Sequence, residues 1–334
     1  MDREQEEMQF LGLFGIFKES YKIIISWRKI FSQITLTLIL PLTFIFLAHL
    51  EISNSLFKDI KHTEFEKEIS RPGSKRYNNL SDTLSSEWIN FWLFKVAYFT
   101  ILLILSLMST AAVVYTIASV YTGRELTFKN VMSVVPKVWK RLMITFLCMF
   151  VAFFVYNFLA AFILITCLAL LPYNAVVAEI ITIYVFLTIY LTGFVYMTVI
   201  WQLASVVSVL ENSYGLKAMT ISKDLIKGNR VVAVSIFFLL NLSFILIEFL
   251  FELLVVQGSS LEAWKRAGFG ILCFVLLLTF FLFGLVIQTI LYLVCKSYHH
   301  ENIDKDDLSN HLESYLGDYE PLSGKDVQLE HYQV

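Results

Sequence analysis

The chain contains six long runs of predominantly apolar residues, and these runs restrict its fold more than any other feature of the sequence. A helix of about 20 apolar residues spans the hydrocarbon core of a bilayer, where every backbone polar group must be satisfied within the protein. The charged fraction of 16% and mean hydropathy of +0.68 exclude an ordinary soluble protein, in which about 25% of residues are charged. We predict an all-α membrane bundle with transmembrane helices at about 30–50, 89–120, 142–171, 175–208, 231–256 and 267–295.

The distribution of Lys and Arg predicts the orientation of these helices. With the N-terminus in the cytosol, the segments on the cytosolic side carry 17 Lys and Arg, and those on the opposite side carry 8. Cytosolic loops of membrane proteins are enriched in these residues. We therefore expect both termini in the cytosol, a lumenal or extracellular loop at 51–88, and a cytosolic acidic tail, partly disordered, at 296–334.

Three amphipathic segments precede predicted spans, at 15–36, 126–147 and 214–237. Each begins with an apolar residue and a Lys, and a second basic cluster follows about ten residues later. We predict three repeats, each an interfacial helix followed by two spans, with the first helix in the N-terminal region 1–29. In one interpretation these helices form a cytosolic collar that packs against the bundle. In the other they lie in the membrane interface, with their apolar faces toward acyl chains and their basic residues toward anionic headgroups. In the middle copy the apolar face holds Val131, Met132, Val134, Val135, Val138, Trp139 and Leu142, opposite Asn130, Ser133, Lys137, Lys140 and Arg141.

The segment "LENSYGLKAMTISKDLIKGNR" resembles a plant family of uncharacterised six-span integral membrane proteins, some of them labelled polyadenylate-binding-protein-binding proteins. "FLGLFGIFKES", "ITLTLILPLTFIFLAH" and "YLGDYEPLSGKDVQLE" are similar too, so the resemblance covers nearly the whole chain. The plan of one helix and two spans distantly resembles the membrane domain of bacterial glycerophosphodiester phosphodiesterases. The resemblance implies a six-span fold and a plant source, and it supplies no catalytic residues.

Charged residues inside the spans are candidates for a functional site, because a charge in hydrocarbon is costly. Lys95 lies near the outer end of the second span, Glu248 and Glu252 lie one turn apart near the outer end of the fifth, and Glu179 begins the fourth. We predict an ion pair between Lys95 and Glu248 or Glu252, with Glu248 the more buried acid. The cluster is interpreted either as a structural pair that sets helix register or as a coupling site for protons or a cation.

Modification and sorting signals occur outside the charge cluster. Asn79-Leu80-Ser81 matches the N-glycosylation pattern, and its loop is the long segment expected on the lumenal side. Cys295, at the inner edge of the last span, is a palmitoylation candidate. Tyr319 and Leu322, in Tyr319-Glu320-Pro321-Leu322, fit a motif read by vesicle-coat adaptors.

Known signatures of enzymes are missing from the sequence, including G-x-S-x-G, H-E-x-x-H, the Walker loop and G-x-G-x-x-G. We therefore expect no catalytic residues, no cofactor and no metal site, and we interpret His299 and His300 as part of a solvated tail. The net charge of −2 gives no indication of nucleic-acid binding. We expect a non-enzymatic protein of the endoplasmic reticulum, endomembrane system or plasma membrane that organises lipids or partner proteins through its cytosolic collar, or assists trafficking. Its expected partners are membrane lipids, through anionic headgroups at the cytosolic face. The alternative is a transporter or channel that uses the Lys and Glu cluster.

Overall fold

The computed structural model describes residues 11–123, 126–172, 176–258 and 262–298, and every secondary-structure element in these ranges is helical. Six helical stretches are long and apolar enough to cross a membrane, as predicted, which is compatible with an integral membrane protein. The elements are α2 (Leu13–Ser26), α3 (Arg28–Ile34), the π-helix η1 (Thr35–Ile39), α4 (Leu40–Ile69), α5 (Lys75–Tyr121), α6 (Phe128–Ala169), α7 (Val176–Leu210), α8 (Leu216–Leu225), α9 (Arg230–Phe251), the π-helix η2 (Glu252–Val256) and α10 (Ala263–Tyr298).

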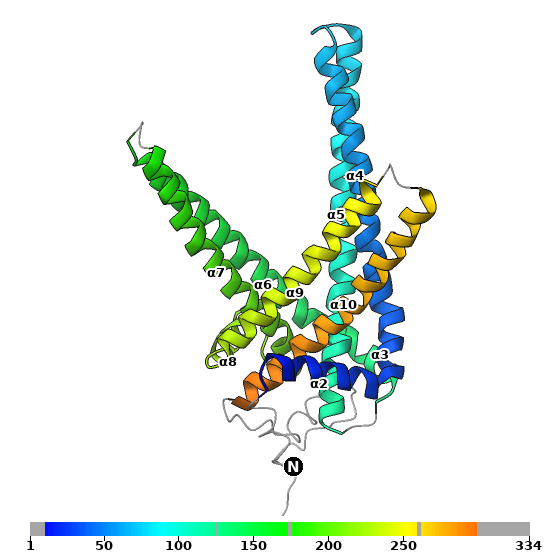
Figure 1. Cartoon of the computed structure of the whole chain (residues 1–334), viewed down its shortest axis with the longest axis vertical. Coiled ribbons are helices and arrows are strands. Elements are labelled where there is room, and N and C mark those ends of the chain that lie inside the picture. The colour runs from blue at the N-terminus through cyan, green and yellow to red at the C-terminus, as the bar shows by residue number, and fades with distance from the viewer. Residues whose placement is uncertain (1–10, 124–125, 173–175, 259–261, 299–334) are drawn as a thin grey trace, which may run out of the picture.

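Three antiparallel hairpins, α4–α5, α6–α7 and α9–α10, join at one end of the bundle (Figure 1). We call this end, where α2 and α8 also lie, the basal end, and the opposite end the distal end. Hairpins α4–α5 and α9–α10 also pack against each other, whereas α6–α7 diverges from them toward its distal tip. The pairing agrees with the predicted order of one amphipathic segment and two spans, but the three-repeat scheme itself stays a prediction.

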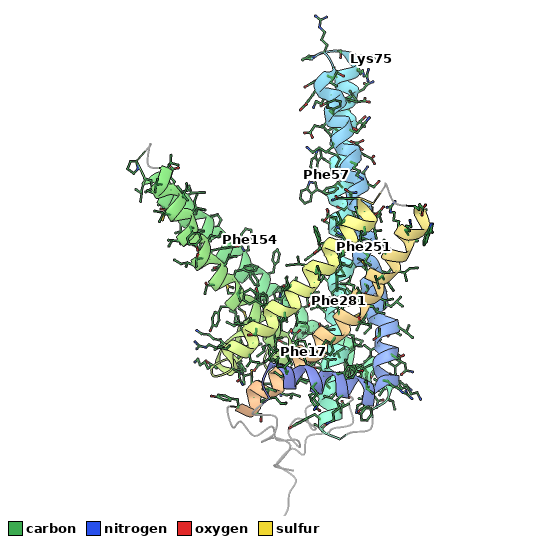
Figure 2. The ribbon with its side chains drawn as sticks, viewed as in Figure 1. Phe17, Phe57, Lys75, Phe154, Phe251 and Phe281 are labelled. Atoms are coloured by element: carbon green, nitrogen blue, oxygen red, sulfur yellow. The ribbon has the colours of Figure 1, made fainter. Side chains whose placement is uncertain are left out.

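The main core fills the basal half of the bundle. Nearly every residue of α5 from Leu107 to Ser119 is buried, because α6, α7 and α10 pack around this stretch. Ala111 and Ala112 allow those helices to approach closely, as small residues do in membrane bundles. By contrast, described residues 150–172 and 176–198 of the α6–α7 hairpin include no buried side chain. Phe154 marks this exposed arm in Figure 2.

The segment 51–88, which we expected to be a loop, is mostly a helical hairpin, and its position on the lumenal or extracellular side stays a prediction. Helix α4 continues to Ile69 and α5 begins at Lys75, so only a short turn separates them. The polar residues here are compatible with a helix, since Lys61 pairs with Glu64 at 2.7 Å one turn away. The Ser74 side chain caps α5 by accepting from the Tyr77 N–H. The hairpin therefore extends well beyond the distal ends of α9 and α10, with Lys75 at its tip (Figures 1 and 2).

The three amphipathic segments differ in structure. The first and third contain separate helices, α2 and α8, but the middle segment continues into the span as part of α6. Pro136 interrupts the hydrogen-bond ladder without ending α6, and its side chain lies on the exposed face. The apolar face of this segment does not point to lipid: Val131, Val134, Val135, Val138 and Leu142 are all buried in the main core.

Candidate functional site

Lys95 does not form the predicted ion pair with Glu248 or Glu252. Its ammonium group lies 2.8 Å from Nε2 of His49 on α4 and 5.2 Å from the centre of the Phe91 ring. With Lys95 as the donor, His49 accepts through Nε2 and carries its proton on Nδ1, an atom that is buried without a partner in the described part of the chain. The His49 ring also stacks on Tyr98 at 3.6 Å between centroids. The cation is held within the α4–α5 hairpin, because these two helices are adjacent over most of their length.

The acids of the predicted cluster lie on other elements, and none of them forms an ion pair with Lys95 in the described ranges. Glu248 is half-buried and Glu252 is exposed, so the predicted order of burial is confirmed. Glu252 accepts from the Gln257 side chain at 3.1 Å. Glu179 lies near the distal tip of the α6–α7 arm, which diverges from the other hairpins, so its predicted membership of the cluster is wrong. Splay of the α6–α7 arm, which depth along each span does not reveal, separates Glu179 from the other charges.

A distal ion pair that we did not predict joins α4 to α10. Arg266 donates to Glu51 at 2.5 Å, and its Nε donates to the Val255 carbonyl at 2.5 Å. Val255 belongs to the π-helix η2, whose backbone hydrogen bonds depart from the α-helical pattern. Arg266 supplies a hydrogen-bond donor to the backbone carbonyl of Val255 at this point. Glu51 and Arg266 each adjoin the end of a predicted span, on the same predicted side of the membrane. This pair of opposite charges at equal depth could have been recognised from the sequence.

A second ion pair that we did not predict closes the basal end. Glu211 follows α7, and its Oε1 accepts from Tyr292 at 2.6 Å and from Lys296 at 2.8 Å, both on α10. The two charged side chains are only 20% exposed. A nearby turn is tied to α6, since Thr145 Oγ1 accepts from the Gly215 N–H at 2.8 Å. Gly215 has a φ of 65°, which favours glycine. These contacts hold the ends of α6, α7 and α10 together.

The basal end carries many cations that have no carboxylate partner within the described ranges. The acids near them are already engaged: Glu19 pairs with Lys22, Asp224 with Lys227, and Glu211 with Lys296. The cations without such a partner come from α2, α3, α6, α8 and α9, and all of them are exposed. They are Lys18, Arg28, Lys29, Lys129, Lys140, Lys217, Lys223 and Arg230.

Apolar side chains and an open pocket accompany these cations. Phe14, Tyr21 and Ile25 are exposed on α2, and with Lys18 they follow the spacing of one helix face. Between α3 and the start of α6 lies a pocket of about 500 Å³ whose lining includes Arg28 and Lys29. The rest of the lining is Ser26, Trp27, Ile30, Gln33, Leu126, Thr127 and Phe128. This arrangement suits a ligand with an anionic group and an apolar part.

The modification candidates have different outcomes. Cys295 is completely buried in the core, so the prediction of palmitoylation there is wrong: its thiol faces neighbouring helices instead of the membrane edge. Asn79 is exposed in the first turns of α5, near the distal tip, and its glycosylation stays a prediction. Tyr319, Leu322, His299 and His300 lie outside the described residues. In the described ranges, no three His, Cys, Asp or Glu side chains converge as a metal site would require.

Comparison with known proteins gives a single family assignment. The model of a family described as Domain of unknown function (DUF8558) matches residues 1–332, which is nearly the whole chain. No curated protein and no solved structure matches the chain.

Proposed function

The chain belongs to the family described as Domain of unknown function (DUF8558), and we propose that it is a non-enzymatic membrane protein that gathers anionic lipids at its basal end. The observation that carries this proposal is the group of basal cations that have no carboxylate partner among the described residues, next to exposed apolar side chains of α2. Each Lys or Arg close to an anionic membrane surface contributes about 1 kcal/mol to binding. The basal end is the cytosolic side in this proposal, as the Lys and Arg distribution predicts.

The pocket between α3 and α6 is the proposed place for a headgroup. Arg28 and Lys29 supply positive charge, and the backbone N–H groups at the start of α6 add partial positive charge. Trp27, Ile30 and Phe128 supply an apolar wall for the adjoining carbons of the lipid. Anionic lipids held here would be concentrated around the bundle in the endomembrane system or plasma membrane, and any partner protein that recognises them would be recruited with them.

A charge-matched pair of variants tests this function. The basal variant replaces Lys18, Arg28 and Lys29 with Gln, and the distal control replaces Lys58, Arg71 and Lys75 with Gln, so both lose three exposed cations. The full chain is reconstituted in phosphatidylcholine nanodiscs containing phosphatidylserine, and native mass spectrometry measures the retained lipid.

We expect phosphatidylserine retention to fall in the basal variant, by about fivefold for each cation lost at low salt. The distal control is expected to retain it, and high salt should weaken retention by the parent chain because salt screens exposed charges. Equal loss in both variants, or equal retention of phosphatidylserine and phosphatidylcholine by the parent chain, would contradict the proposal.

The alternative, a transporter or channel, has less geometric support. It needs Lys95 and the two acids at one site, whereas Lys95 contacts His49 and Glu252 contacts Gln257. Replacing Glu248 and Glu252 together with Gln would abolish activity in such a transporter, but would leave lipid retention at the basal end unchanged in our proposal.

A further inference from the structure

A second pocket lies inside the membrane-spanning region, where α7, α9 and α10 meet. It has a volume of about 240 Å³ and is open on one side. Most of its lining is apolar, and Phe281 on α10 marks its position in Figure 2. Its lining residues also include three that carry side-chain amides, Gln202, Asn241 and Gln288, one from each helix. Such a combination of apolar walls with a few polar groups is typical of ligand sites.

The three amides lie at similar depths from the basal ends of their helices. Gln202 is 8 residues before the end of α7 at Leu210, Asn241 is 11 after the start of α9 at Arg230, and Gln288 is 10 before the end of α10 at Tyr298. At 1.5 Å per residue these separations are about 12–17 Å along the helix axes. The pocket therefore opens at the depth of lipid chains, in the basal half of the bilayer.

The hydrogen bonds of these amides leave donors and acceptors for a ligand. Gln288 donates to Ser205 Oγ at 2.7 Å and to the Gln202 backbone carbonyl, and Asn241 donates to the Phe237 carbonyl at 2.8 Å. In the described part of the chain, the side-chain amide of Gln202 has no hydrogen bond, and neither do the side-chain oxygens of Asn241 and Gln288. A polar group without a partner is costly in hydrocarbon, where water is scarce.

We propose that this pocket binds the hydroxyl end of an uncharged lipid, whose hydrocarbon part lies along the apolar wall. A hydroxyl group donates to a side-chain oxygen of Asn241 or Gln288 and accepts from the Gln202 amide. No charged side chain lines the pocket, so a phosphate at this depth would have no cation to offset its cost. The volume holds only the polar end of a lipid, and the open side lets the remaining chain extend into the bilayer. The site is independent of the basal cations.

Two glycine positions on α10 with open space at the Cβ position provide a matched test. Gly284 lines the pocket, and a Cβ added there meets no atom within 4 Å, so the side chain of Gly284→Leu starts in open space and occupies part of the pocket. Gly268 has the same free space on the same helix but lies near its distal end, away from the pocket, so Gly268→Leu is the matched control.

The measurement is photolabelling of the full chain in phosphatidylcholine nanodiscs with a diacylglycerol that carries a diazirine in its acyl chain. We expect labelled peptides from α9 and α10, at least tenfold weaker labelling in Gly284→Leu, and unchanged labelling in Gly268→Leu. Asn241→Leu should reduce labelling about threefold, the typical effect of one hydrogen bond in a membrane protein. Equal labelling in Gly284→Leu and the parent chain would overturn the proposal.

Competition distinguishes the possible lipids. Unlabelled diacylglycerol and cholesterol both carry a free hydroxyl, and the stronger competitor of the two identifies the lipid class. Triacylglycerol lacks the hydroxyl and should not compete. Competition by triacylglycerol or by added phosphatidylcholine as strong as that by diacylglycerol would show that the hydroxyl is not recognised, and this result would also overturn the proposal.

Discussion

At the scale of residues, Glu211 connects the ends of two spans through one carboxylate oxygen. Both Tyr292 and Lys296 donate to it, and the pair is largely shielded from solvent. Hydrogen bonds to charged groups contribute more than those between neutral groups, and the loss of one partner leaves the other without compensation. Lys95, toward the distal end, also has a hydrogen-bond partner for its charge, which is a nitrogen of His49 instead of an acid.

We therefore predict that Glu211→Gln lowers the free energy of unfolding by about 1–3 kcal/mol. The neutral amide still accepts a hydrogen bond but no longer attracts the Lys296 ammonium group. Thermal unfolding in detergent, followed by Trp fluorescence, measures the change. Lys227→Gln is the control, because its pair with Asp224 is more than half exposed and should contribute less than about 1 kcal/mol. A larger effect from Lys227→Gln than from Glu211→Gln would contradict this prediction.

At the scale of elements, α6 combines an amphipathic basal segment with a span in one helix. Its basal residues are buried on the side that faces α5 and α8, whereas its distal residues are exposed on most sides. The sequence pattern of the basal segment is amphipathic in either environment, because acyl chains and a protein core both accept Val and Leu. The structure assigns this apolar face to the protein core, and Lys140 is exposed on the opposite face.

A pair of identical substitutions on α6 separates the two environments. Leu142 is 1% exposed and Leu147 is 53% exposed. We predict that Leu142→Ala lowers the free energy of unfolding by about 2 kcal/mol or more, because it leaves a cavity in the core. Leu147→Ala should change it by less than about 0.5 kcal/mol, as for substitutions away from packed regions. Similar effects in the same unfolding assay would indicate that the basal part of α6 does not pack as described.

At the scale of the whole molecule, six helical stretches that are long and apolar enough to cross a membrane leave α2 and the end of α10 at the same end of the bundle. Helix α2 packs on α10 there, and Phe17 lies 5.8 Å from Phe283 between ring centroids. The α4–α5 hairpin extends at the other end and carries Asn79 on an exposed face. If all six helices cross the membrane, α2 and the end of α10 face one side of it and Asn79 faces the other.

We predict that tags at both termini are cleaved by protease added to sealed microsomes, since the Lys and Arg distribution places the basal end in the cytosol. Asn79→Gln should increase gel mobility by the same amount as glycosidase treatment of the parent chain. Protection of both tags would reverse the orientation. Cleavage of one tag alone would contradict an even number of crossings. Equal mobility of Asn79→Gln and the parent chain would show that Asn79 carries no glycan.

The six spans and their all-helical class follow from the sequence by itself, because a bilayer requires long apolar helices whatever their neighbours are. The relative burial of Glu248 and Glu252 was also predictable. The partners of the charged residues were not. Lys95 and Glu248 share a similar depth in sequence, but only the packing of α4 against α5 places His49 beside Lys95.

The tertiary structure also decided which apolar surfaces are covered. Apolar composition is the same for a side chain in lipid and one in the core, so the sequence does not distinguish the buried Cys295 from a thiol at the membrane edge. Likewise, the polar stretch 51–88 lacks the apolar run that predicts a span, yet it is helical because α4 and α5 pair with each other along their length. Composition determines that a segment enters the membrane; contacts between distant segments determine what each residue touches there.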